Sequence, residues 1–130
     1  MLAGRYQPLQ VTIADGASKS GFVDTLGLRI VGVLVPTGAE QTRLRFFADV
    51  LGDDDTGAIV VNDAGEEINA VYATVAVPNV IAISAIGGTN RGPLPPASRY
   101  AVQSMSGVST AAVQTGDLIV TLICEPLPTT

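Results

Sequence analysis

The chain has 130 residues, of which 47% are hydrophobic and 15% are charged, and its formal net charge is -5. This length suits a single domain, 1–130, with one hydrophobic core. The acidic balance and the lack of a basic run disfavour direct binding to nucleic acid or to an anionic membrane surface, since both need a positive field. Average soluble domains carry about 25% charged residues, so a surface this poor in charge favours burial in an oligomer.

Fourteen glycines and eight prolines punctuate runs rich in valine, isoleucine, leucine and threonine. This pattern is typical of short strands joined by turns. The first predicted strand, 9–14, alternates between apolar and polar residues and ends at the turn Asp15-Gly16. A short piece follows near Phe22 and Val23. Segment 28–36 is mostly apolar at both odd and even positions, hence on both faces of a strand. This pattern predicts a central strand that is covered on both faces.

The second half of the chain continues in the same way. Segment 43–51 alternates and turns through 52–57, so that 59–61 can return beside it as a hairpin. Its inward face is predicted to carry Leu44, Phe46, Ala48 and Val50. Further strands are predicted at 68–77, 80–86, 99–106 and 117–127.

The remaining segments are predicted to be irregular. They are an N-terminal arm at 1–8, a long loop rich in glycine and proline at 87–98 and a C-terminal tail at 126–130. The sequence predicts about eight strands and no amphipathic helix. Parallel strands need crossover connections, which are usually helices, so the sheets should be antiparallel. The expected fold is all-β, a single antiparallel β-sandwich or jelly-roll-like domain with long loops and extended termini.

The chain lacks histidine and has one cysteine, Cys124. These counts exclude a Ser-His-Asp triad, a Cys-His pair and a thiolate zinc site within one chain. Cys124 lies in an apolar run and is predicted to be a small buried hydrophobe. We therefore expect no enzyme, no catalytic residue, no cofactor and no metal.

Two acidic groups deserve a separate interpretation. Residues 53–55 are three aspartates, which could hold a cation, but they lack the spacing and the distal glutamate of a calcium loop. A solvated hairpin turn is the favoured interpretation. Glu66 and Glu67 are adjacent, so on a strand they point to opposite faces and are expected to form a polar turn edge.

No apolar run reaches the roughly 20 residues that a membrane-spanning helix needs. The start of the sequence, MLAGR, lacks the layout of a signal peptide. We therefore expect the protein to be made and kept in a cytoplasm.

Segment 11–36 reads VTIADGASKSGFVDTLGLRIVGVLVP. It resembles a recurring segment of tailed-bacteriophage virion proteins: an alternating strand, a turn of Asp-Gly-Ala-Ser type, Val-Asp, Leu-Gly, and an apolar strand that ends in proline. Segments 44–46, 62–68, 99–104 and 117–125 are similar to later parts of the same pattern, in the same order. The chain departs from the pattern at 90–96 and at Val102-Gln103, which leaves its exact role open.

The resemblance implies a β-sandwich virion component of the capsid decoration (cement) type. Such a protein binds the major capsid protein on the virion surface and carries no catalytic residues, and by analogy it is expected to form a homotrimer. The contact is expected to involve the arm, the long loop or the outward face of 43–51. The interface candidates are Arg5, Tyr6, Arg43, Arg45, Arg91 and Leu94.

Two alternatives remain at this point. The first is another virion part, such as a neck, tail or head-fibre protein, which copy number per particle would distinguish. The second is a small carbohydrate-binding module, which the absence of tryptophan and the six remaining aromatic residues disfavour.

Overall fold

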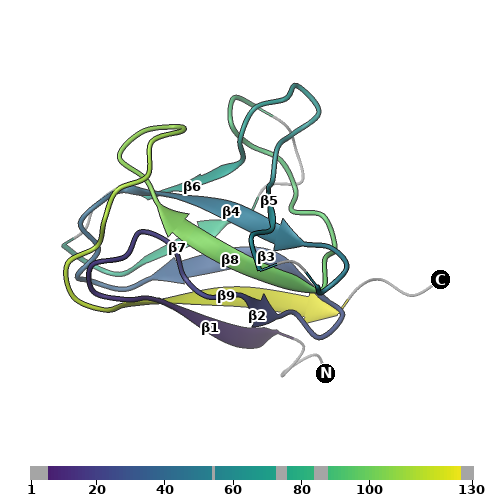
Figure 1. Cartoon of the computed structure of the whole chain (residues 1–130), viewed down its shortest axis with the longest axis horizontal. Helices are drawn as coiled ribbons and strands as arrows, with labels where there is room; N and C mark the ends of the chain where they lie inside the picture. The colour runs from purple at the N-terminus through teal and green to yellow at the C-terminus, as the bar shows by residue number, and fades with distance from the viewer. Residues whose placement is uncertain (1–5, 54, 73–75, 84–87, 127–130) are drawn as a thin grey trace.

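The computed structural model describes residues 6–53, 55–72, 76–83 and 88–126. These residues form nine strands in two antiparallel sheets and contain no helix (Figure 1). The first sheet has the order β1-β9-β3-β7, and the second has the order β2-β8-β4-β5, with β6 pairing to β4. The strands are β1 (Gln7–Ile13), β2 (Val23–Asp24), β3 (Leu28–Val35), β4 (Arg43–Asp49), β5 (Ala58–Ile59), β6 (Asn69–Val71), β7 (Asn79–Ala82), β8 (Arg99–Ser104) and β9 (Leu118–Pro126).

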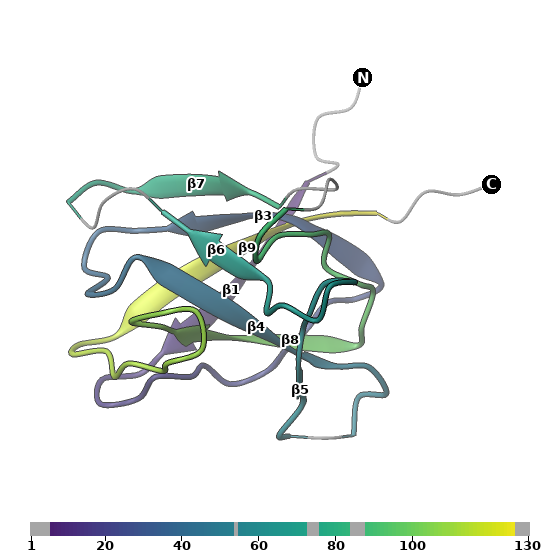
Figure 2. The same ribbon diagram turned by 90° about the horizontal axis from the view of Figure 1, so that it is seen from above.

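The chain alternates between the two sheets as it proceeds. β1, β3, β7 and β9 form the first layer, whereas β2, β4 and β8 belong to the second (Figure 2). The ends of the chain pair with each other, because β1 runs antiparallel to β9 from Gln7↔Cys124 to Ile13↔Leu118. This wrapping is a jelly-roll order, and it confirms the predicted all-β sandwich.

The core lies between the sheets and is built by residues two apart along each strand, as a pleated strand requires. In β9, Val120, Leu122 and Cys124 are fully buried, and in β4, Leu44 and Phe46 are fully buried. Burying one such side chain stabilises the fold by about 1.5–3 kcal/mol. The alternation predicted for 43–51 is therefore confirmed over β4.

The same alternation fails beyond Asp49. Val50 was predicted to face inward but is 60% exposed. The strand ends because the Asp49 side chain accepts hydrogen bonds from the backbone N–H groups of Gly52 (2.9 Å) and Asp53 (3.3 Å). This turn directs the chain away from the core before Val50 can enter it.

The strand predicted at 68–77 is shorter and covers Asn69–Val71, which pair with Arg45 to Arg43. It ends at Val71 because its partner β4 begins at Arg43, and residues 73–75 of the predicted strand lie outside the described residues. β5 pairs with Phe47 and Ala48 farther along the same edge of β4. β7 is also shorter than the predicted 80–86, of which residues 84–86 lie outside the described residues.

Two other expectations change, those for the N-terminal arm and for β3. β1 begins at Gln7, so the predicted arm 1–8 loses its last two residues to an edge strand, where Pro8 is tolerated. The loop 87–98 remains irregular over its described part, apart from a bridge between Gly88 and Arg91. β3 is central within its sheet, but only one of its faces is covered by the other sheet, so the prediction of two covered faces was wrong.

A buried glutamine holds three loops together at one end of the sandwich. Gln114 is 1% exposed, and its amide nitrogen donates to the carbonyl oxygens of Gly38 (2.9 Å) and Thr115 (3.1 Å). Its amide oxygen accepts from the Glu40 backbone N–H, and its backbone carbonyl accepts from Gly16. A buried polar side chain satisfied in this way fixes loop geometry without an unpaired group.

Leu122→Ala should lower the free energy of unfolding by about 2–5 kcal/mol, because a fully buried side chain is replaced by a cavity. Ile119→Ala on the same strand is the matched control. Ile119 is 47% exposed, so its truncation should cost less than about 1 kcal/mol. Urea denaturation of both variants measures this, and equal losses would contradict the assignment of the two faces of β9.

Candidate interaction surfaces

The outer face of the β4–β8 sheet is covered by cations that lie over aromatic rings. The Lys19 ammonium is 3.9 Å from the centroid of the Phe47 ring, and the Arg45 guanidinium is 5.3 Å from it. The Arg99 guanidinium lies 5.2 Å from the Phe22 ring. These distances fall within the range of cation–π attraction. These cations and rings form a cation–aromatic layer, which stabilises the outer surface of the β4–β8 sheet.

Arg45 is also held by polar partners from neighbouring segments. Its Nε donates to Gln103 Oε1 at 2.8 Å, and its Nη1 pairs with Glu67 Oε1 at 3.0 Å. The side chains of Arg45 and Glu67 are only 12% and 16% exposed. This ion pair is partly shielded from water and joins β4 to the segment before β6.

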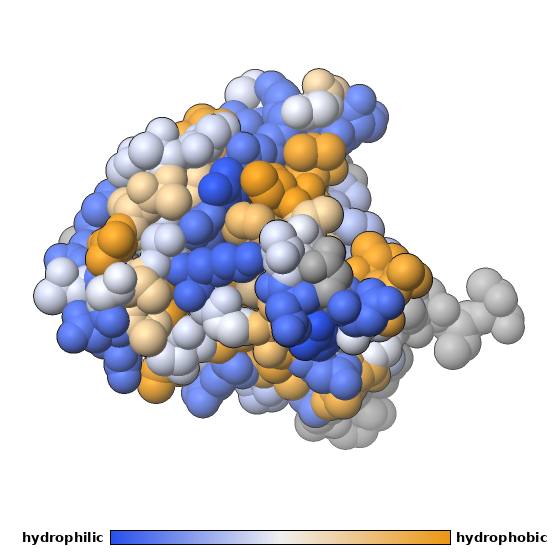
Figure 3. Space-filling view, in the orientation of Figure 1, coloured by the Kyte–Doolittle hydropathy of each residue, from blue (hydrophilic) through white to orange (hydrophobic). Residues whose placement is uncertain are grey.

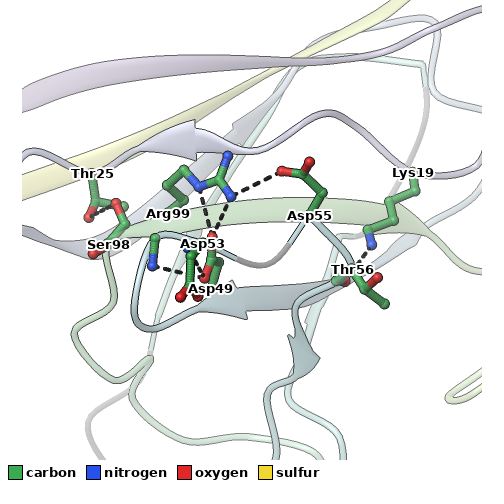
Figure 4. A network of polar contacts seen from close by, with 9 residues as sticks. Lys19, Thr25, Asp49, Asp53, Asp55, Thr56, Ser98 and Arg99 are labelled. Atoms are coloured by element: carbon green, nitrogen blue, oxygen red, sulfur yellow. Dashed lines mark hydrogen bonds and ion pairs between the residues drawn. The ribbon is translucent and has the colours of Figure 1, made fainter.

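Asp49 and Arg99 form the most deeply placed ion pair of this face (Figure 4). The Asp49 side chain is 1% exposed and receives Arg99 Nε at 2.8 Å, while Arg99 Nη2 also reaches Asp55 at 3.1 Å. The hydrogen bonds to Asp49, and then those to Asp55, raise the pKa of Arg99 above its ordinary value. The same carboxylate ends β4, so one side chain sets both the strand end and the charge pairing.

The end of the loop 52–57 can lie against the outer face of the β4–β8 sheet because residue 57 is a glycine. Gly57 has φ of +67°, a left-handed conformation that L side chains rarely adopt, and a Cβ there would lie 2.6 Å from the Phe22 ring. The neighbouring Thr56 carbonyl accepts a hydrogen bond from Lys19 Nζ at 2.9 Å. Glycine is therefore required where the loop meets the cation–aromatic layer.

Asp49→Ala should destabilise the fold by on the order of 3 kcal/mol, because it leaves Arg99 without its main partner and the turn N–H groups without an acceptor. Asp55→Ala is the control, since Asp55 is 95% exposed at its side chain and binds the same guanidinium. Its loss should cost less than about 1 kcal/mol. Chemical denaturation measures both, and a cost for Asp55→Ala as large as that for Asp49→Ala would refute the network.

The interface candidates end up in different environments. Arg45 is held within the chain as described above, and Arg43 Nη1 donates to Asn69 Oδ1 at 2.7 Å. Arg91 and Tyr6 are exposed, Tyr6 at 63%. Arg5 lies outside the described residues. Leu94 is only 6% exposed and packs in the core, so a surface contact by its side chain was the wrong expectation.

The outer face of the other sheet was not predicted as a contact surface. None of the described segments forms a second layer over it, yet β3 and β9 present apolar side chains on it. Residues that pair across neighbouring strands form rows on this face, and three of these rows carry no charge. They are Thr12 with Ile119; Gln10 with Thr121, Leu34 and Val80; and Pro8 with Ile123, Gly32 and Ala82. The first charged pair, Arg29 with Glu125, lies beyond the last row.

The two outer faces therefore differ in chemistry. Figure 3, in the orientation of Figure 1, shows the face over β4 and β8, where hydrophilic side chains separate small apolar patches. The uncharged face lies on the opposite layer and includes Val80 at 71% and Ile119 at 47% exposure. Its signal in the sequence is the loss of alternation in 28–36, which predicted a strand covered on both faces.

The acidic groups are used in hydrogen bonds and ion pairs of the fold. Glu67 pairs with Arg45, and Glu66 accepts from the Asn62 side chain (3.0 Å) and the Asn90 backbone N–H (3.2 Å), which together lower the pKa of Glu66. The Asp53 backbone N–H donates to Asp49, Asp55 pairs with Arg99, and Asp54 lies outside the described residues. Within the described ranges, no group of three or more His, Cys, Asp or Glu residues is arranged to hold a metal ion.

Cys124 is fully buried in β9, as predicted, and burial raises the pKa of its thiol to about 11. At pH 8 the thiol should therefore stay protonated and inaccessible, and thiolate is the reactive form. We expect a colourimetric thiol reagent to leave the native protein unlabelled and to label one thiol per chain in denaturant. Rapid labelling of the native protein would contradict the buried placement.

Comparisons with known proteins add no relative to this description. No protein-family model matches the chain, and no curated protein matches it. The described residues contain no helix with the length and hydrophobicity that crossing a membrane requires. The fold class, a two-sheet antiparallel β-sandwich, is what the structure establishes.

Proposed function

We propose that this protein is a structural, non-catalytic virion component of a tailed bacteriophage that decorates the capsid by binding the major capsid protein. The observation that carries the proposal is the outer face of β3 and β9, which presents the apolar side chains Leu34, Ile119 and Ile123 although the described part of the chain does not cover it. In antiparallel sheets a solvated face normally carries polar residues. An uncharged outer face therefore favours a protein partner.

The size of this face suits the centre of an interface. Strand spacing and residue rise give roughly 300 Å² for three rows across four strands. A standard interface buries about 800 Å² per partner, with an apolar centre and a polar rim. The remaining area would come from adjoining segments, of which Tyr6 precedes β1 and is exposed.

Charge supports binding on the outside of a shell. A net charge of -5 opposes contact with packaged DNA. On the β4–β8 face, Lys19, Arg45 and Arg99 contact acidic or aromatic groups of the same chain. Apolar contact, rather than attraction between opposite charges, would then provide the affinity for the shell.

The alternatives are separable. A sugar-binding module needs exposed aromatic faces, but Phe46, Tyr72 and Tyr100 are buried, and Phe22 and Phe47 lie under cations. A neck, tail or head-fibre protein would occupy one ring or one vertex of the particle, whereas a decoration protein covers the shell in hundreds of copies. The homotrimer remains part of the proposal and is tested by sedimentation.

The proposal predicts that Ile119→Asp and Val80→Asp abolish binding to shells assembled from the cognate major capsid protein, because each places a charge in the apolar centre. Val113→Asp is the control, since Val113 is 59% exposed in a loop outside this face. Co-sedimentation measures occupancy, and circular dichroism checks folding. Full occupancy by both face variants, or cryo-electron microscopy that places the protein in a single ring, would refute it.

A further inference from the structure

The turn between β2 and β3 holds a leucine in a backbone conformation that suits it poorly. Leu26 has φ of 57° and Gly27 has φ of 76°, so two consecutive residues are left-handed, as in a type I′ turn. A hydrogen bond of 2.9 Å from the Leu28 N–H to the Thr25 carbonyl closes the turn. Asn-Gly is the preferred sequence of such turns, and a bulky residue in this region is an outlier. Leucine therefore lowers the stability of this turn.

Neighbouring groups fix this conformation. The Asp24 carboxylate accepts the Leu26 N–H at 2.8 Å. Thr25 is fully buried beside Ser98, whose carbonyl accepts its N–H at 2.9 Å and its hydroxyl at 3.1 Å (Figure 4). Strained residues persist only where the surrounding structure determines their conformation, and they are concentrated at functional sites.

Burial within the chain does not compensate for this strain. Leu26 is 61% exposed and does not belong to the hydrophobic core that the described residues form. An exposed leucine in the left-handed region is unfavourable twice, because its backbone is strained and its side chain stays in water. Cover by a partner would offset both costs.

Two more exposed apolar side chains lie beside this turn. The segment that follows β4 presents Val50 at 60% and Leu51 at 81% exposure. Val50 lines the same surface depression as Gly27, so the end of β4 meets the β2–β3 turn at one end of the sandwich (Figure 1). We call Leu26, Val50 and Leu51 the end patch.

The charge beside the end patch is negative. Asp24 lines the same depression and is exposed, and Asp53 and Asp55 are exposed in the loop 52–57. The cation of this region, Arg99, is already paired with acidic groups of its own chain. Complementary charges around an apolar contact set the orientation of a partner. A partner for the end patch therefore needs apolar side chains with lysine or arginine beside them.

We propose that Leu26 is a contact residue of the capsid interface and that the end patch docks on an apolar surface of the shell that carries lysine or arginine. This inference rests on the proposed function and extends it to a second element. The uncharged outer face supplies roughly 300 Å² of the about 800 Å² that a standard interface needs. The β2–β3 turn leads directly into β3, so the end patch adjoins that face beyond the Arg29–Glu125 pair.

The test exchanges Leu26 for a residue that such a turn prefers. Leu26→Asn should raise the melting temperature by about 2–6 °C, because asparagine tolerates the left-handed conformation. It should also weaken binding to shells of the cognate major capsid protein at least about tenfold, because it removes an apolar anchor. Thermal denaturation followed by circular dichroism measures the first effect, and co-sedimentation at increasing shell concentration measures the second.

Two controls carry the same exchange to asparagine. Leu51→Asn lies in the end patch but outside the left-handed region, so it should weaken binding without raising the melting temperature. Val113→Asn changes a side chain that is 59% exposed in the loop between β8 and β9, and it should alter neither property. The three variants thus separate the backbone strain from the apolar contact.

The outcomes also separate this contact from the proposed function. A Leu26→Asn variant that binds shells as tightly as the wild-type chain would overturn the contact alone. An unchanged or lower melting temperature would show that leucine is not costly in the turn, and the inference would fall. Failure of the wild-type chain to bind shells would overturn the proposed function and this contact together.

Discussion

A two-layer sandwich can cover only one face of each sheet, and this constraint shapes the surface of the whole molecule. Each outer face must be stabilised by its own side chains, by water or by a partner. In the β4–β8 sheet, cations lie over Phe22 and Phe47 and pair with carboxylates. In the β1-β9-β3-β7 sheet, Ile119, Leu34 and Val80 lie outward without such a cover. This difference in cover is the basis of the proposal that the β1-β9-β3-β7 face contacts a partner.

The ion pairs explain how a chain with few charges keeps a defined surface. Asp49 ends β4, accepts two backbone N–H groups and binds Arg99. Arg45 joins β8 and the segment before β6 through Gln103 and Glu67. Because these groups are partly buried, they are less screened by salt than exposed pairs. They order the loops around β4, where two short strands share one edge.

The sequence was most informative where alternation was strict. It placed β1 and β4 and their inward residues as far as Ala48, since a period of two requires one buried face. It failed where tertiary contacts decide, as at β6, which ends at Val71 because its partner β4 begins at Arg43. Leu94 appeared to be a loop residue, but it packs in the core beside Tyr100, whose hydroxyl donates to the Pro95 carbonyl. Arg45 appeared free because its partners Gln103 and Glu67 lie far away in the sequence.

The apolar outer face was visible in the sequence only as missing alternation. A strand that is apolar at both odd and even positions is expected to be covered on both faces, but the pattern cannot say whether the second cover belongs to the same chain. The described residues do not cover the outer face, and under the proposed function the capsid shell covers it. Hydroxyl-radical footprinting of the protein free and on assembled particles tests this most directly. Protection of Ile119, Leu34 and Val80 with unchanged labelling of Val113 is the predicted result, and equal labelling of all four in both states would contradict it.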